Sequence, residues 1–285
     1  MRVAFLMRRP AADGHSITTE MVQLLRNRGV TVDLIQVDAG PSALADIRPE
    51  HDLYVLRTVN DASLSIAWIL ARQGARCINP VVVSRTCRDK AVVASLLGRA
   101  GVPVPETWLV ERPIQVAPLL VDGPLVIKPL HGSQGRGVQV VWHLDEILNI
   151  GAAGGPVVAQ RYLPRQGKDR KLYCIGGQMF GIQRQWPAST YEQKQGKQFT
   201  VTPEVHDLAL AVSEAIGTDL FGLDIVISRG QAYVVDVNPF PGFKGVPDGA
   251  LLLADYIYAK AAGTTTSAVD TKDVGPAVAR RAVGS

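Results

Sequence analysis

The stretch from Phe221 to Gly242 constrains the fold of this chain most, because it places acids inside apolar β-sequence. Two runs of β-branched and aromatic residues flank a short turn around Gly230, which predicts a β-hairpin covered on both faces. Three oxygen-bearing side chains interrupt the runs: Asp224, Asp236 and Asn238. A carboxylate buried alone is costly, so these groups need a cation or hydrogen-bond donors. Without a nearby Cys or His, the set favours a hard cation such as Mg²⁺.

The register of this hairpin decides whether the three side chains can share one ion. Asp224 lies opposite Asp236 if the loop is odd-numbered and centred on Gly230, and Asn238 then lies on the same face. Gly230 permits a three-residue, bulged loop of this kind. A two-residue turn at Arg229-Gly230 would instead place the two carboxylates on opposite faces. Both turns stay open at this point, as does the alternative of two strands that carry satisfied structural acids.

The composition narrows the class of protein. The 285 residues are 47% hydrophobic and 20% charged, which is typical of a globular chain with one large domain or two to three small ones. We expect no membrane span, because no apolar run approaches about 20 residues, and the N-terminus lacks the layout of a secretory signal. Three cysteines without paired spacing indicate a reducing cytoplasm and no zinc site.

The net charge of +4 fits either a solvated basic surface or an anionic ligand such as a nucleotide or acidic substrate. No basic run is dense enough to indicate nucleic-acid binding.

Residues 1–85 alternate strand and helix, which predicts an open parallel sheet with flanking helices. The expected strands are 3–7, 31–37 and 52–56, and the expected helices are 18–28 and 62–73. Gly29 and Gly74 are placed to end the two helices. No G-x-G-x-x-G follows the first strand, so a dinucleotide site is not expected there. Arg57 follows the third strand, where such sheets bind ligands, and is either a substrate residue or an exposed arginine.

The middle of the chain contains a glycine-rich loop between two strands. We expect one helix over 84–100, with Thr86 and Asp89 in capping-box spacing, and a stiff hinge at Pro103 and Pro105. Strands at 125–129 and 138–142 then flank the loop 130–137. Its glycines allow backbone N–H groups to approach phosphate oxygens, and Lys128 places a cation beside them. The second strand excludes a P-loop, in which a helix follows.

The remaining elements complete a second α/β region. A strand at 157–164 leads into a linker, and a hairpin turns at Gly176-Gly177. We expect a mobile polar loop over 186–200 and a helix over 203–216 that begins with a capping threonine and a proline. A last helix extends through Ala262 after the cap Asp248. Residues 263–285 have the composition of a disordered tail.

Taken in order, these landmarks resemble the ATP-grasp superfamily, and most closely its RimK-type ligases. The resemblance covers residues 1 to about 262 and implies an α/β (α+β ATP-grasp) fold. It implies an N-terminal domain over 1–85, a central lid over 86–160 and a C-terminal subdomain over 161–262, with ATP clasped between the last two. The motifs that carry it are Asp89-Lys90, Lys128-Pro129 with the glycine loop, Gln160–Leu163, Gly167-Lys168-Asp169, Phe221–Asp224 and Asp236–Pro239.

The resemblance also implies a ligand set of ATP with Mg²⁺ or Mn²⁺, two ions in all. The implied metal ligands are Asp224, Asp236 and Asn238, and Arg184 matches an arginine near the transferred phosphoryl group, acting with Lys128. The candidate substrate residues are Arg57, Lys171, Lys194 and Lys197. The implied nucleotide-binding residues are Lys90, Lys128, Ser133, Gln134, Gly135, Gly137, Gln160, Arg161, Tyr162, Leu163 and Asp169.

The implied reaction joins a carboxylate to an amine. The carboxylate attacks the γ-phosphoryl group of ATP, and the amine of an amino acid or peptide then displaces phosphate from the acyl phosphate. Alternatives are a phosphotransferase on the same scaffold, similar to inositol phosphate kinases, and a nucleotide-binding protein without catalysis. The chain departs from the family pattern at Arg161 and Asp236, where the family usually has Glu. Homo-oligomers are common in this class.

Overall fold

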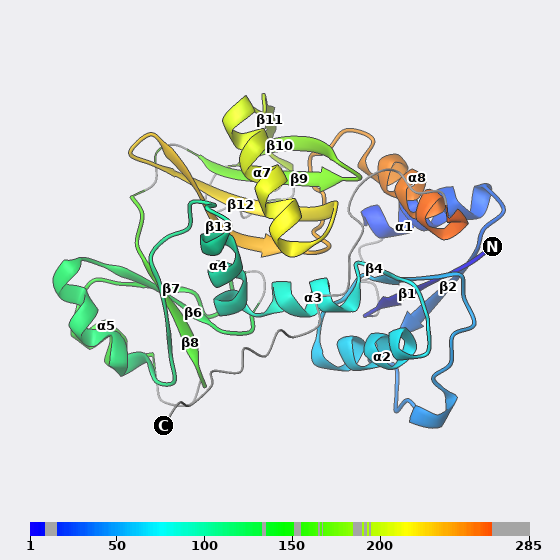
Figure 1. Ribbon diagram of the computed structural model, residues 1–285, viewed down its shortest axis with the longest axis horizontal. Helices are drawn as coiled ribbons and strands as arrows, with labels where there is room; N and C mark the ends of the chain where they lie inside the picture. Colours follow the sequence, from blue (N-terminus) through cyan, green and yellow to red (C-terminus); the bar gives the residue numbers. More distant parts are fainter. Residues whose placement is uncertain are drawn as a thin grey trace, which may run out of the picture.

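The computed structural model describes residues 1–8, 16–132, 135–150, 155–164, 166, 168–184, 190, 193 and 195–263. Three sheets organise this part of the chain, one for each region expected from the sequence (Figure 1). Within it, no helix is both long and apolar enough to cross a membrane. The predicted tail, apart from Gly263, lies outside the described residues.

The first sheet is parallel, with the strand order β2 (Thr31–Gln36), β1 (Arg2–Met7), β3 (Leu53–Leu56) and β4 (Cys77–Ile78). Alternate residues of β1 enter different cores, so Val3 packs with helix α1 (Ile17–Asn27) and Ala4 with helix α2 (Asp61–Arg72). A short 3₁₀ turn, η1 (Leu44–Asp46), links β2 to β3. The predicted strands and helices of this region are confirmed. The sequence did not indicate β4, because two residues carry no periodicity.

Side-chain caps and glycines set the ends of α1 and α2. The Ser16 hydroxyl accepts from the backbone N–H of Thr19, and Asn60 forms a reciprocal capping box with Ser63. Gly29 and Gly74 follow the helices with φ of 77° and 90°, the left-handed region that glycine adopts without a Cβ penalty. Both predicted stops are therefore correct.

The single helix expected over 84–100 is wrong, because the chain breaks at Asp89 into α3 (Val81–Arg88) and α4 (Lys90–Arg99). Asp89 has an extended backbone, and its side chain accepts from the backbone N–H groups of Ala91 and Val92. It therefore caps a new helix instead of completing a capping box with Thr86. The break places Lys90 at the first position of α4.

The second sheet is antiparallel, in the order β5 (Thr107–Val110), β8 (Val157–Arg161), β6 (Leu125–Pro129) and β7 (Gln139–Val141). The 3₁₀ helix η2 (Pro113–Asp122) and helix α5 (Leu144–Leu148) cover one face and share a core with β6, β7 and β8. The strand–loop–strand order expected around the glycine loop is correct. This sheet projects from the rest of the molecule (Figure 1).

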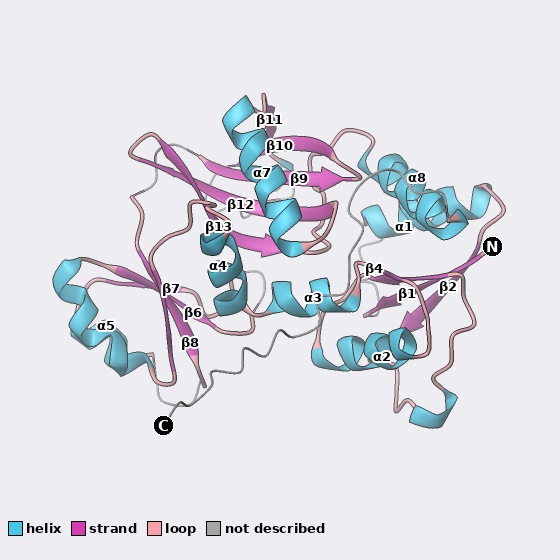
Figure 2. Cartoon of the chain, in the orientation of Figure 1, coloured by secondary structure: helices cyan, strands magenta, loops and turns pink. Residues whose placement is uncertain are grey.

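The third sheet has the order β11 (Lys197–Phe199), β10 (Gln178–Arg184), β9 (Asp169–Ile175), β12 (Leu220–Ser228) and β13 (Gln231–Asn238), all antiparallel. Helix α7 (Pro203–Ile216) and α4 pack against one face. Figure 2 shows both helices beside these strands. Strand β11 corrects the loop expected over 186–200. It pairs with β10 where Gly181 faces Phe199, and a Cβ at Gly181 would come within 2.7 Å of that ring.

Helix α8 (Gly249–Ala262) returns to the start of the chain and lies beside α1 (Figure 1). Its Leu253 and Ile257 share one core with Val3 and Phe5 of β1 and with strands β9, β10 and β12. Asp248 occupies the N-cap position, but φ is 49° and its side chain makes no capping bond. The side-chain cap expected from Asp248 is therefore wrong.

Candidate active site

The β12–β13 hairpin brings the two predicted acids together, but not through the expected loop. Ser228 pairs with Gln231, so the turn has two residues, Arg229 and Gly230, with φ of 50° and 81°. The register then shifts by one, because Ile225 pairs with Val234 whereas Asp224 pairs with Asp236. Val235 is the extra residue of a β-bulge. The bulge, rather than an odd-numbered loop, sets Asp236 opposite Asp224.

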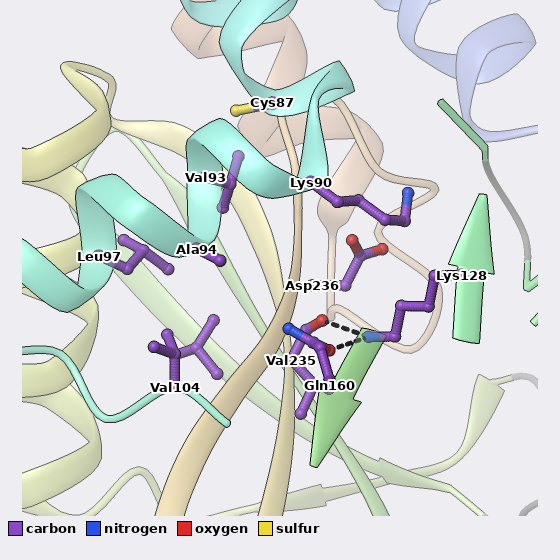
Figure 3. A pocket seen from close by; sticks show the side chains of 11 residues that line it. Cys87, Lys90, Val93, Ala94, Leu97, Val104, Lys128, Gln160, Val235 and Asp236 are labelled. Atoms are coloured by element: carbon purple, nitrogen blue, oxygen red, sulfur yellow. Dashed lines mark hydrogen bonds between the residues drawn. The ribbon is translucent and has the colours of Figure 1, made fainter. Parts of the chain in front are cut away.

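Asp236 is the centre of a cluster of opposite charges. Its carboxylate lies between the side chains of Lys90 and Lys128 (Figure 3). Burial, and next the neighbouring Asp224 carboxylate, raise the pKa of Asp236, while Lys90, Lys128 and Lys171 act to lower it. Two acids and three lysines from five elements therefore lie within electrostatic reach of one another.

Lys128 connects the second sheet to the third. Its ammonium group donates to Oε1 of Gln160 at 2.5 Å and to the carbonyl oxygen of Val235 at 2.9 Å (Figure 3). Gln160 is 5% exposed and donates in turn to Oγ1 of Thr107 at 3.1 Å. The bulge therefore has a second effect, because it directs a backbone carbonyl at the predicted phosphate-binding lysine.

Lys90 anchors the glycine loop to the start of α4. Its ammonium group donates to the carbonyl oxygen of Gly132 at 2.8 Å. Gly135 and Gly137 have φ of 69° and 71°, and a Cβ at Gly137 would lie 2.8 Å from the Pro129 ring. The loop geometry thus requires glycine at this position. The predicted residues Ser133 and Gln134 lie outside the described residues.

A pocket joins these groups to an apolar wall formed by α4 and the hinge that follows it. One side is polar, with Lys90, Lys128, Gln160 and Asp236. The other side is apolar and includes Val93, Ala94, Leu97 and Val104. A pocket with one apolar and one charged side suits a ligand that has a flat ring at one end and phosphates at the other. The buried thiol of Cys87 also lines it, with a pKa raised to about 12 by burial and, less, by Asp236.

The predicted adenine-contacting segment divides between two faces of β8. Gln160 faces the pocket, whereas Arg161 donates to the carbonyl oxygens of Leu119 and Gly123 at 3.1 and 2.8 Å. The Arg161 guanidinium also lies 5.1 Å from the ring centroid of Trp108. Its side chain is thus engaged within the second sheet and η2, away from the pocket.

The next two residues of that segment continue past the strand. Tyr162 packs against Trp142 with ring centroids 5.5 Å apart, and its backbone N–H donates to the carbonyl of Pro124. Leu163 is half-buried. For Arg161, Tyr162 and Leu163, contact with a nucleotide stays a prediction.

Arg184 and Tyr173 form a pair on the third sheet. Arg184 donates to the hydroxyl of Tyr173, and the Arg184 Nε atom is buried with no hydrogen-bond partner among the described residues. Burial raises the pKa of Tyr173 to about 12. Asp169 lies directly opposite Arg184 in the β9–β10 register. A buried donor without an acceptor is costly, so this guanidinium is set up to receive an acceptor from a ligand.

The predicted substrate residues lie in different places. Lys171 lies opposite Asp224 and forms an ion pair with it, which puts it in the acid cluster. Arg57 lies at the carboxyl end of β3 and reaches the carbonyl oxygen of Phe240, just after β13. Lys197 is exposed on the edge strand β11, and Lys194 lies outside the described residues.

The family model of the RimK-like ATP-grasp domain matches residues 87–254, more than half of the chain. The chain belongs to this family. The matched region runs from the end of α3 into α8, so it contains the pocket, the glycine loop and the β12–β13 hairpin.

Two relatives and one solved structure illustrate the similarity. A probable alpha-L-glutamate ligase of Saccharophagus degradans is 25% identical over 301 residues, which cover 93% of this chain and 98% of that protein. Another, of Parasynechococcus marenigrum, is 27% identical over 187 residues, covering 61% of this chain but 40% of that protein. The RimK domain ATP-grasp protein of Sphaerobacter thermophilus is 21% identical and has the same fold, with a TM-score of 0.73 over 90% of this chain and 100% of that one.

The ATP-grasp site offers oxygen ligands that fit magnesium. The two carboxylates face each other across β12 and β13, and Asn238 follows Asp236 by two residues on the same strand. The Asn238 Oδ1 atom accepts from the backbone N–H of Phe240 at 3.0 Å, which fixes the amide and leaves a second lone pair. No group of three His, Cys, Asp or Glu gathers anywhere in the described ranges. Two carboxylates with phosphate oxygens are nevertheless the usual Mg²⁺ environment.

Two groups of this ATP-grasp site were not found from the sequence. Tyr173, which contacts Arg184, alternates with Lys171 on β9 and could have been found from that strand periodicity. The Val235 carbonyl has no side-chain signature, because any residue supplies a carbonyl. The role of this carbonyl becomes visible only once the bulge is known from the structure.

Proposed function

We propose that this chain is an ATP- and Mg²⁺-dependent ligase that joins a carboxylate to an amine, with an amino acid or peptide among its substrates. The relatives named as probable glutamate ligases support the reaction class. The observation that carries the proposal is the charged cluster of Asp224, Asp236, Lys90, Lys128 and Lys171, in which Lys90, Lys128 and Asp236 line one pocket. We place the activity in the cytoplasm, since Cys77, Cys87 and Cys174 are all free thiols.

Each group of the cluster has a role in this proposal. Lys90 and Lys128 bind the phosphates of ATP together with the glycine loop. Asp224, Asp236 and Asn238 would hold Mg²⁺, which when bound neutralises phosphate charge. Arg184 offers its Nε–H, which has no acceptor in the described part of the chain, to the transferred phosphoryl group or to the substrate carboxylate. Positioned cations of this kind offset the repulsion between a carboxylate and a triphosphate.

The chemistry proceeds in two steps. The substrate carboxylate oxygen attacks the γ-phosphorus, the bond to the β-phosphate oxygen breaks, and ADP leaves. The amine nitrogen then attacks the acyl carbon, phosphate leaves with the C–O electron pair, and the nitrogen loses a proton to give the amide. Orientation of the two substrates supplies much of the acceleration.

The test is incubation of the purified protein with Mg²⁺-ATP and pools of carboxylic acids and amines. The expected products are ADP, phosphate and an amide, identified by mass spectrometry. The variant Lys128→Met should lower product formation by roughly 10²-fold or more, because a charge-stabilising group is lost. Arg99→Met, which removes an exposed cation outside the pocket and outside these motifs, is the matched control. ADP with a phosphorylated alcohol and no amide would assign a phosphotransferase instead.

A further inference from the structure

Arg57 is a cation with no anionic partner among the residues that the structure describes. It follows β3 directly, and its backbone N–H donates to the carbonyl of Leu6 at 3.0 Å, so it continues the carboxyl edge of the first sheet. Its Nε donates to Oγ1 of Thr18 at 2.8 Å, and its Nη1 donates to the carbonyl oxygen of Phe240 at 3.4 Å. The guanidinium lies 5.2 Å from the Phe240 ring centroid. All of these partners are neutral.

Burial is what distinguishes Arg57, because three arginines near the same sheet pair with an acid and Arg57 is buried without one among the described residues. Burial lowers the pKa of Arg57, so desolvation disfavours its charge, and no carboxylate among the described residues offsets that cost. Elsewhere in the described ranges, Arg2 pairs with Asp33, Arg28 with Asp255 and Arg88 with Asp61, whereas Arg26 and Arg76 donate to backbone carbonyls as Arg57 does. An anion from outside the chain would complete the Arg57 environment.

The position of Arg57 relates it to the reacting centre. Phe240 lies two residues beyond Asn238, and two residues of extended chain span at most about 7 Å. The Asn238 side chain is hydrogen-bonded to the backbone N–H of Phe240, which ties the two together. Arg57 therefore contacts the chain close to Asn238, and it does so from the edge of the first sheet where parallel α/β sheets bind ligands. A small molecule can reach from one to the other.

We infer that Arg57 binds the carboxylate of an amino acid that serves as the amine substrate. This inference rests on the ligase function proposed above. The reacting carboxylate is consumed, since its oxygen goes to phosphate and its carbon to the amide. A guanidinium fixed on the first sheet instead suits a second carboxylate, one that the reaction leaves unchanged. The amino nitrogen attacks the acyl carbon, phosphate leaves, and the carboxylate held by Arg57 is unchanged.

The experiment compares two nucleophiles on the same acyl phosphate. Hydroxylamine has no carboxylate and converts the acyl phosphate to a hydroxamate, so a hydroxamate screen of carboxylic acids with Mg²⁺-ATP first identifies the acid substrate. The twenty amino acids and their amides are then offered as amines. In Arg57→Gln, the ratio of amino-acid ligation to hydroxamate formation should fall roughly 10–100-fold, the range for loss of a charged hydrogen bond. The preference for an amino acid over its amide should disappear, and Arg57→Lys should restore part of it.

Arg76→Gln is the matched control. Arg76 also donates to distant backbone carbonyls, those of Lys260 and Ala261, but it lies at the amino end of β4, the opposite edge of the same sheet. This variant should lose thermal stability and keep the wild-type ratio. An unaltered ratio in Arg57→Gln, or an equal fall for both nucleophiles, would overturn the inference. No hydroxamate from the wild-type protein with any acid would instead overturn the proposed function.

Discussion

Two neighbouring hairpins of the third sheet have turns of the same length but different strands beyond them. β9 and β10 pair without interruption from Asp169–Arg184 to Ile175–Gln178, across Gly176-Gly177. β12 and β13 are joined by an equally short turn, yet Val235 is inserted beyond it. In the regular hairpin, the alternation of side chains between the two faces of β10 is enough to position Arg184. The bulged hairpin keeps Asp236 opposite Asp224 and also directs a carbonyl at Lys128. The extra residue therefore occurs where the chain must present both a side chain and a backbone group.

The largest effect should come from removing the acid that the bulge positions. Asp236→Ala should lower ATP turnover by roughly 10²–10³, because a proposed ligand of the charge-neutralising ion is lost. Steady-state ADP release measures this, with circular dichroism to confirm folding. The control is Asp219→Asn, since Asp219 contacts Tyr256 and Lys260 away from the pocket and should affect stability alone. Near-normal turnover in folded Asp236→Ala would refute the metal assignment.

Deleting Val235 makes the bulged hairpin as regular as its neighbour. Asp236 then still faces Asp224, since Val234 keeps its pairing with Ile225, but Lys128 loses its carbonyl acceptor. We expect the KM for ATP to rise about tenfold, the effect of one misplaced hydrogen bond to a charged group. Val235→Ala keeps the carbonyl and should have the smaller effect. Kinetics of the deletion variant equal to wild type would mean that the bulge does not serve Lys128.

A pH series measures what the bulged hairpin costs in stability. Burial first, and then Asp224, raise the pKa of Asp236 above its ordinary value of 3.8. A raised pKa in the folded state means that the stabilising contribution is complete below the unfolded pKa and is lost as the pH rises through the folded pKa. Ionised Asp236 therefore destabilises the ligand-free protein at neutral pH. Asp236→Asn should raise the apparent melting temperature there by about 2–4 °C, with the gain vanishing towards about pH 3.

Asp33→Asn is the control of opposite sign for this series. His51 and then Arg2 lower the pKa of Asp33, so its contribution is present above the unfolded pKa and is lost in acid. This variant should lower the melting temperature at neutral pH. An Asp236→Asn variant that also loses stability there would show that Asp236 is a satisfied structural acid.

The smallest expected effect concerns the turns themselves. Arg229 has φ of 50°, where a side chain is strained, so Arg229→Asn should raise the free energy of unfolding by about 0.5 kcal/mol. Gly176, at φ of 58°, is the counterpart in the regular hairpin, and a Cβ there would lie 3.1 Å from the Tyr256 ring. Gly176→Ala should lower the free energy of unfolding by about 1–2 kcal/mol. Chemical denaturation measures both, and a loss of stability in Arg229→Asn would contradict a strained turn.

The sequence indicated the family and the three regions, but it left open whether the two acids share a face and did not show how they come to face each other. Val234 and Val235 are both apolar, so a one-residue bulge leaves no mark on the pattern. The ion pair of Lys171 with Asp224 was also not predicted, because β9 and β12 pair across 53 residues of sequence. Short elements such as β4 and β11 lack the length that periodicity requires.

Helix placement shows the same limit. The composition of residues 84–100 predicts one helix, but the backbone of Asp89 is extended and divides the segment into two helices. Nothing in local sequence indicates that Gln160 and Arg161, adjacent in one motif, serve different sides of the second sheet. Strand alternation separates them once the strand is placed.

The docking of α8 beside α1 affects how the protein is made. Leu253 and Ile257 complete the apolar layer on one face of the first sheet. That layer is therefore shielded from water only after α8 has packed against β1 and α1, which lie far from it in sequence. During synthesis, β1 and β3 leave the ribosome with this face uncovered until α8 has followed. Contacts so distant in sequence form slowly. The nascent first sheet therefore needs protection from aggregation until α8 packs against it.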